Sequence, residues 1–196
     1  MAFQDAFRQF PTIETTRLIL SEISFEDASA YHHQQCSALE LPDRPPWGFG
    51  FEMESVEKVR SAIQFSQNAW KKKTRLRFGI RLKPESHSSP LLLIGCCELF
   101  DFTNQFKAEL GYWLGAAYHN QGLMTEAVQA VVAYGFDTMG LGRIFAHTST
   151  RNLPSIALLK KVGFVPEGVL RQDSKRDGQW DDTALMAILP TDFTSK

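Results

Sequence analysis

The segment that most constrains the fold is a strand-like stretch, a short polar turn and a long helical stretch over residues 111–136, GYWLGAAYHNQGLMTEAVQAVVAYGF. Apolar side chains recur at helical spacing over 123–138: Met124, Ala127, Val128, Val131 and Tyr134. Gly122 stands where this helix should begin, and glycine there lets backbone N–H groups face outward. A helix N-terminus also carries a partial positive charge. The segment therefore predicts a site for an anion such as a phosphate.

The surrounding segments predict the remaining elements. Ser24 and Asp27 have the spacing of a capping box at the start of a helix. Alternation and helical periodicity predict strands at 16–23, 76–82, 91–102, 107–115 and 143–149, helices at 24–40, 54–71 and 152–164, and two further strands within 167–189. This order predicts one α+β (mixed α/β) domain over 1–196, with a mostly antiparallel sheet covered by helices on both faces.

Composition excludes several classes of protein. With 21 basic and 22 acidic residues the net charge is -1, which provides no field to recruit nucleic acid or anionic lipid. The odd count of three cysteines argues against a disulfide framework, and no Cys/His spacing resembles a zinc site. The N-terminus does not resemble a signal peptide, and no run reaches membrane-spanning length. We therefore expect a cytoplasmic monomer or homodimer with no metal, membrane or nucleic-acid partner.

The turn before the helix differs from the common nucleotide-binding loops. It lacks the Lys-Ser/Thr ending of a P-loop and the three glycines of a dinucleotide fingerprint. Two interpretations stay open at this point. The turn either binds a pyrophosphate through successive backbone N–H groups without a dedicated lysine, or it only links a strand to a helix.

Four segments carry a resemblance to a known family: TTRLILSEI, AELGYWLGAAYHNQGLMTEAV, TSTRNLPSIALLKKVGFVPEGVLR and DGQWDDTALMAIL. Their order and spacing resemble those of the GNAT superfamily of acetyl-coenzyme A-dependent N-acetyltransferases, and the nearest branch is similar to the ribosomal-protein (Rim-type) enzymes. The resemblance spans nearly all of residues 14–190. It implies acetyl-CoA as co-substrate and a GNAT-like sheet in which the strand before the turn splays away from its neighbour.

The resemblance also implies which residues bind the cofactor. The family pattern Q/R-x-x-G-x-G/A falls on His119 to Met124, with Gly122 as the matched glycine, while His119 and Met124 depart from it. Asn152 matches an asparagine that contacts the cofactor arm, although a helix N-cap explains it equally well. The expected cofactor-binding residues are Trp113, Leu114, Gly115, His119, Asn120, Gln121, Gly122, Leu123, Met124, Thr125 and Asn152.

Candidate catalytic residues follow from the same comparison. Ser155 matches the position of a hydroxyl that protonates or hydrogen-bonds the departing thiolate in similar enzymes, but it is also an ordinary polar residue of a first helical turn. The candidate general bases are Glu98, Glu109 and Asp173. Ser174 occupies the position that matches a family base, so the choice among the three carboxylates stays open, as does the possibility that each is merely solvated.

The acceptor is expected to be a primary amine. At pH 7 deprotonating an α-amine of pKa ~7.9 costs about 1.2 kcal/mol, against about 4.6 kcal/mol for a lysine of pKa ~10.4. A protein N-terminal α-amine is therefore the favoured acceptor, and Trp47, Phe49 and Phe51 in the Pro-rich segment 41–52 either clamp it or cap the core. The alternatives are a small-molecule amine such as a polyamine, amino acid or antibiotic, and a non-catalytic acyl-CoA sensor.

Overall fold

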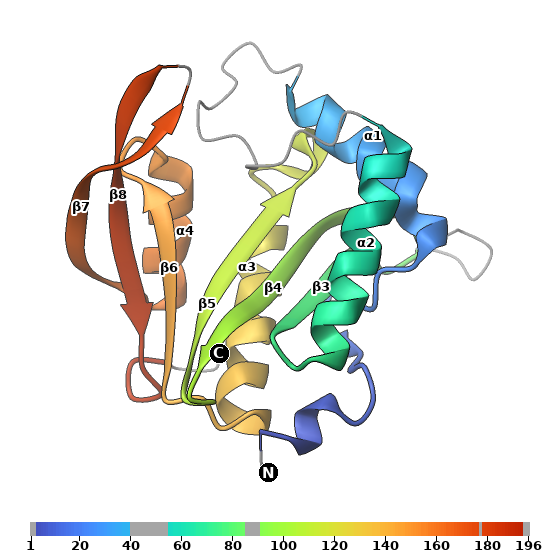
Figure 1. The fold of residues 1–196 in the computed structure, drawn as a ribbon, viewed down its shortest axis with the longest axis horizontal. Helices are drawn as coiled ribbons and strands as arrows, with labels where there is room; N and C mark the ends of the chain where they lie inside the picture. The colour runs from blue at the N-terminus through green and yellow to red at the C-terminus, as the bar shows by residue number, and fades with distance from the viewer. Residues whose placement is uncertain (1–2, 40–54, 85–90, 177, 194–196) are drawn as a thin grey trace.

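The computed structural model describes residues 3–39, 55–84, 91–176 and 178–193, and Figure 1 shows their arrangement. Within these ranges eight strands form one sheet in the order β1-β2-β3-β4-β5-β6-β8-β7. The strands are β1 (Ile13–Glu14), β2 (Leu18–Ser21), β3 (Arg75–Leu82), β4 (Leu93–Thr103), β5 (Lys107–Leu114), β6 (Arg143–Ser149), β7 (Val165–Arg176) and β8 (Gln179–Ile188). The predicted mixed α/β class is confirmed.

The sheet is antiparallel except at its centre. Neighbouring strands pair in opposite directions from β1 to β5 and again from β6 through β8 to β7. Only β5 and β6 are parallel, because α3 (Leu123–Ala133) connects them as a crossover. The sheet is therefore mostly antiparallel, as the sequence predicted.

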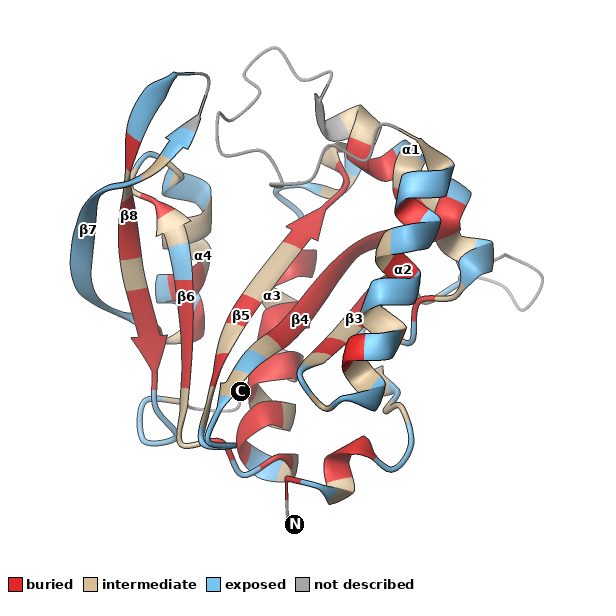
Figure 2. Ribbon diagram, in the orientation of Figure 1, coloured by how far each residue is buried: buried red, intermediate tan, exposed pale blue. Residues whose placement is uncertain are grey.

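Helices cover both faces of the sheet. In Figure 1, α1 (Ala28–Leu39) and α2 (Val56–Lys71) lie on one face, and α3 and α4 (Leu153–Val162) lie on the other. The larger buried cluster joins α3 and α4 to the sheet, and a smaller cluster joins α1 and α2 to β4 and β5. Burial also varies along the sheet. Figure 2 shows that α3 is largely buried, whereas much of β7 at the sheet edge is exposed.

Local sequence explains most element boundaries. Ser24 and Asp27 form the predicted capping box, which opens the 3-10 turn Phe25–Asp27 ahead of α1. Gly163 ends α4 with a φ of +117°, a conformation that favours glycine. The helix predicted over 123–138 is present, but its winding changes: α3 ends at Ala133 and continues as a π-helical turn, Tyr134–Thr138, because Met139 and Leu141 bond to carbonyls further back than in an α-helix.

Candidate active site

The site begins where β5 and β6 separate. Their parallel pairing covers only three positions, Lys107 with Arg143, Ala108 with Ile144 and Glu109 with Phe145. Beyond these the two strands diverge, as Figure 1 shows, while β5 continues to pair with β4 up to Leu114. We call the diverging stretches, 110–114 of β5 and 146–149 of β6, the fork. The splayed strand pair implied by the sequence is therefore present.

The backbone at the end of β5 has one side facing the fork. Leu114 lies opposite Gly95 of β4, and the adjacent bond runs from the Gly115 N–H to the Ile94 carbonyl at 2.8 Å. In this antiparallel register the N–H and C=O of Leu114 point away from β4, toward the fork. The Gly115 N–H, by contrast, is hydrogen-bonded to β4. It is therefore not available to bind a cofactor arm.

The turn before α3 presents backbone groups outward. Asn120 has a φ of +58° and Gly122 a φ of +74°. The residues on either side of Gln121 therefore both lie in the left-handed region. Residues 119–122 are exposed, whereas Leu123 and Met124 are buried in the larger cluster. Thr125 is half-buried in the first turn. Only the backbone of Leu123 and Met124 can serve an anion here, because their side chains pack inward.

The two departures from the family pattern therefore have structural explanations. The Met124 side chain is 7% exposed and fills the core, so it does not obstruct the turn. The His119 Nε2 atom lies 2.9 Å from the Leu114 carbonyl oxygen, to which it donates a hydrogen bond. His119 thus ties the turn to the end of β5.

Sequence reasoning missed Arg17, which lies between β1 and β2 and holds this turn in place. The Arg17 side chain donates from Nε to Glu126 at 2.7 Å and from Nη1 to the Gln121 carbonyl at 2.9 Å. Glu126 also accepts from the Thr15 hydroxyl at 2.6 Å and from the Arg17 backbone at 2.8 Å. Burial alone would raise the pKa of Glu126, but these hydrogen bonds lower it. The only sequence signal was the position of Arg17 in the matched segment TTRLILSEI.

Ser155 and Tyr112 meet across the fork. The Ser155 hydroxyl and the Tyr112 hydroxyl are hydrogen-bonded at 2.8 Å, one from the first turn of α4 and the other from β5. Burial raises the pKa of Tyr112, so this phenol stays protonated at neutral pH. Asn152 acts as the N-cap of α4, since its side-chain oxygen accepts from the Ser155 N–H at 3.1 Å. The structure thus shows the capping role of Asn152, with Ser155 in the turn that it caps.

Glu98 and Glu109 have different surroundings. Glu98 on β4 is held between Arg75 at 2.6 Å and Arg77 at 2.7 Å. Burial alone would raise the pKa of Glu98, but the Arg77 guanidinium, assisted by Arg75, lowers it. A carboxylate stabilised in this way is a poor proton acceptor. We therefore regard Glu98 as structural.

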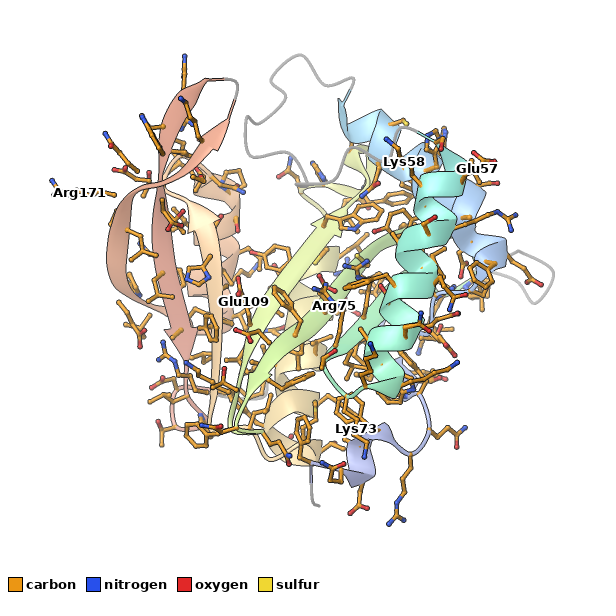
Figure 3. All side chains as sticks on the ribbon, viewed as in Figure 1. Glu57, Lys58, Lys73, Arg75, Glu109 and Arg171 are labelled. Atoms are coloured by element: carbon orange, nitrogen blue, oxygen red, sulfur yellow. The ribbon has the colours of Figure 1, made fainter. Side chains whose placement is uncertain are left out.

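Glu109 faces His147, a residue that the sequence did not single out. Its Oε1 atom lies 3.0 Å from Nδ1 of His147 on β6, just above the base of the fork. Their side chains are 21% and 35% exposed, so solvent reaches this pair. Figure 3 shows Glu109 and Arg75 on the same face of the sheet, the face that carries α1 and α2. The two residues are 38 positions apart in the sequence, so no local sequence pattern could predict that they pair.

The remaining predicted site residues have separate locations. Asp173 is exposed on β7, next to Gln172, where the register with β8 shifts. Trp113 is buried against Tyr31 of α1, with ring centroids 4.8 Å apart, so its side chain belongs to the core. Trp47, Phe49 and Phe51 lie outside the described residues.

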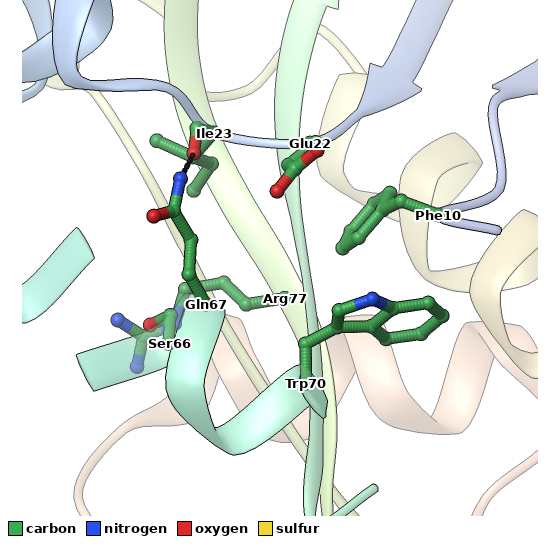
Figure 4. Close-up of a pocket in the computed structure, with 7 residues that line it drawn as sticks. All are labelled: Phe10, Glu22, Ile23, Ser66, Gln67, Trp70 and Arg77. Atoms are coloured by element: carbon green, nitrogen blue, oxygen red, sulfur yellow. Dashed lines mark hydrogen bonds between the residues drawn. The ribbon is translucent and has the colours of Figure 1, made fainter. Parts of the chain in front are cut away.

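A small cavity lies between α2 and β3, on the far side of β4 from the fork (Figure 4). Its volume is about 10 Å³, and the Gln67 amide beside it donates to the Ile23 carbonyl at 3.4 Å. That space holds about one water molecule, so it is too small for either substrate. The lining residues are Phe10, Glu22, Ile23, Ser66, Gln67, Trp70 and Arg77.

In the ranges that the structure describes, no group of three or more His, Cys, Asp and Glu side chains is arranged to hold a metal ion. Every helix in the same ranges is too short or too polar to span a bilayer.

Comparison with known proteins identifies the family. Residues 17–165 match the family described as acetyltransferase (GNAT) domain. An uncharacterized N-acetyltransferase of Bacillus subtilis is 35% identical over 182 residues, 92% of this chain and 97% of that protein. The Escherichia coli [ribosomal protein uS5]-alanine N-acetyltransferase is 38% identical over 85 residues, 43% of this chain and 44% of that protein.

A solved structure supports the same assignment at the level of the fold. It is described as RimL, a ribosomal L7/L12 alpha-N-protein acetyltransferase in complex with coenzyme A, and aligns with a TM-score of 0.73 at 20% identity. The alignment covers 91% of this chain and 98% of that one. With the fork and the turn before α3 in place, the chain belongs to the GNAT family of acetyltransferases and is an N-acetyltransferase.

Proposed function

We propose that this enzyme transfers an acetyl group from acetyl-CoA to a protein N-terminal α-amine in a ternary complex. The observation that carries the proposal is the fork, which has a partly buried hydroxyl pair at one face and a solvent-accessible carboxylate–histidine pair at the other. Direct transfer needs a proton donor for the leaving thiolate and a proton acceptor for the amine. The fork offers both.

The residues around the turn fit the co-substrate. The two left-handed residues on either side of Gln121 and the start of α3 give outward N–H groups suited to a pyrophosphate. The Leu114 N–H points into the fork, where it can donate to a developing oxyanion. When bound, acetyl-CoA would supply an acetyl thioester, the group that the neutral amine takes up as coenzyme A departs as a thiolate.

Ser155 is our candidate for the donor to the thiolate. Its hydroxyl is hydrogen-bonded to Tyr112, whose raised pKa keeps a proton on the phenol. As Ser155 gives up a proton, Tyr112 can donate to the Ser155 oxygen and stabilise it. Tyr112 is therefore a positioning residue, and neither hydroxyl needs to form a covalent bond.

Glu109 and His147 are our candidates for the acceptor side. Side chains alternate along β5: Tyr112 packs on the cluster beneath α3 and α4, and Trp113 packs on the cluster beneath α1 and α2. Glu109 therefore shares the face of Trp113, opposite that of Tyr112. His147 can accept the amine proton while Glu109 orients the imidazole and stabilises its charged form. Acid and base then lie on opposite faces of the sheet.

An α-amine is the favoured acceptor for energetic reasons. Its deprotonation at pH 7 costs about 1.2 kcal/mol, which one solvent-accessible imidazole can offset, whereas a lysine side chain costs about 4.6 kcal/mol. The relative that acts on ribosomal protein uS5 and the alpha-N-protein acetyltransferase of similar fold support the same acceptor class.

Matched peptides would test the proposal. The enzyme is incubated with acetyl-CoA and pairs of lysine-containing peptides that differ only in a free or blocked N-terminus, and mass spectrometry locates the acetyl group. We expect acetylation of the free α-amine, no product from the blocked peptide, and a large loss of turnover in Ser155→Ala and Glu109→Gln.

Other outcomes would replace the proposal. Turnover with polyamines, amino acids or antibiotics but with no peptide would favour a small-molecule acceptor. Tight coenzyme A binding without release on any amine would favour a non-catalytic acyl-CoA sensor. Acetylation confined to lysine side chains would contradict the preference for α-amines.

A further inference from the structure

The candidate phosphate-binding turn has no cationic side chain of its own. Residues 108–142, which cover most of β5, the turn and α3, contain neither lysine nor arginine. A pyrophosphate bound there would rely on backbone N–H groups alone, close to the carboxylate of Glu126 in the first turn of α3. That carboxylate would repel the ligand unless another group compensated its charge.

Arg17, just ahead of β2, supplies the missing charge. Its Nε bonds to the Glu126 carboxylate at 2.7 Å and its Nη1 bonds to the Gln121 carbonyl at 2.9 Å. The first bond neutralises Glu126, and the second fixes the turn between its two left-handed residues. Arg17 therefore acts on both the charge and the shape of the turn.

One nitrogen of the guanidinium is not used by these bonds. Among the described residues, no hydrogen bond involves Arg17 Nη2, which lies 3.5 Å from the position that a Cβ on Gly122 would occupy. The Arg17 side chain is 46% exposed, so Nη2 is accessible at the edge of the turn. A guanidinium with a free N–H beside a helix N-terminus suits a phosphate oxygen.

We propose that Arg17 is a cofactor-binding residue that contacts the pyrophosphate of acetyl-CoA through Nη2 while its other nitrogens hold the turn and neutralise Glu126. This inference rests on the proposed use of acetyl-CoA. It joins two regions that are distant in sequence into one phosphate site: Arg17 just ahead of β2, and the turn together with the first turn of α3 that follows it directly.

Substrates with and without the pyrophosphate would test the proposal. We expect Arg17→Met to raise KM for acetyl-CoA at least about tenfold, the usual loss for a hydrogen bond to a charged group. KM for acetyl-pantetheine, which lacks the pyrophosphate, should not change. Arg143→Met is the matched control, because it breaks a similar Arg–Glu pair, with Glu167 at 2.6 Å, at the far end of the β5–β6 pair. It should leave both KM values unchanged.

A second variant separates phosphate contact from charge compensation. If Arg17 only neutralises Glu126, the double variant Arg17→Met/Glu126→Gln should recover the wild-type KM for acetyl-CoA, which would overturn the proposal. If Arg17 contacts the phosphate, the double variant stays impaired, and Arg17→Lys recovers part of the affinity. An equal rise of KM for acetyl-CoA and acetyl-pantetheine would assign Arg17 a purely structural role.

Direct binding distinguishes failure of this inference from failure of the proposed function. Calorimetry measures coenzyme A binding to the wild type, to Arg17→Met and to Arg17→Lys without any acceptor. A wild type that does not bind coenzyme A would contradict the proposed co-substrate. A wild type and an Arg17→Met variant that bind it equally would contradict only the role of Arg17.

Discussion

The two faces of the sheet differ in what they bury. The face against α3 and α4 is covered by a continuous apolar cluster that includes Leu99 and Val131. The face against α1 and α2 has a smaller apolar cluster, and beside it lie the Arg75, Arg77 and Glu98 ion pairs and the Glu109–His147 pair. The difference indicates that the apolar cluster mainly secures the fold, whereas the other face also holds charged groups, including the proposed base.

Glu98 and Glu109 show the same contrast within the charged face. Glu98 lies between two arginines with its pKa lowered, and it is 9% exposed. Glu109 lies two strands from those arginines, next to a histidine that reaches solvent. The first carboxylate therefore contributes to stability, whereas the second is available to orient a proton acceptor.

The largest expected effect is on the buried ion pairs. Glu98→Gln should lower the free energy of unfolding by about 3–5 kcal/mol, because it leaves the Arg75 and Arg77 charges without their buried partner. Urea unfolding at pH 7 measures the change. A loss below about 1 kcal/mol would mean that the charged face contributes little to the fold.

The same variant should alter the pH dependence of stability. A carboxylate whose folded pKa is lowered stabilises the fold above its unfolded pKa, about 4.3, and that contribution is lost as pH falls through the folded value. Wild-type stability should therefore fall on acidification below about pH 5, and the fall should be shallower in Glu98→Gln. Parallel curves for the two proteins would contradict this role.

The apolar cluster around Leu99 should affect stability but not chemistry. Leu99→Ala removes a fully buried side chain and should cost about 3 kcal/mol, through lost burial and a residual cavity. At a temperature where the variant is folded, its kcat should match the wild type. A large fall in kcat there would show that this cluster also supports the chemistry.

The smallest expected energetic change is catalytic. His147→Gln should lower kcat about 100-fold at pH 7, with little change in unfolding free energy, because it removes the proposed proton acceptor. The deficit should shrink toward pH 9, where an α-amine of pKa about 7.9 is already neutral. Rates compared across this pH range test the prediction, and a pH-independent deficit would indicate a structural role for His147.

Much of the fold could be predicted from local sequence. The capping box at Ser24 and Asp27, the Asn152 N-cap and the Gly163 terminus are short-range features, and the structure reproduces them. The extent of the helix over 123–138 was also predicted, but its π-helical last turn at Tyr134–Thr138 was not, because that turn depends on hydrogen bonds that local periodicity does not reveal.

The candidate site could be predicted only in part. The turn at 119–122 was visible because a glycine before a helix is a local signal. His147 and Arg17 were missed because their partners, Glu109 and Glu126, lie 38 and 109 residues away. The sequence offered Glu98 as a candidate general base because it lies on a strand next to the fork. It could not show that Arg75 and Arg77 pair with this carboxylate.

The sequence by itself determined the order of strands and helices along the chain, the glycine turn at Gly122 and the family. Each of these depends on short stretches of neighbouring residues. Only the tertiary structure decided which charges meet. It paired Arg17 with Glu126, enclosed Glu98 between two arginines and set His147 against Glu109. Electrostatic interactions depend on distance in space, and that distance is fixed only when the sheet brings distant segments together.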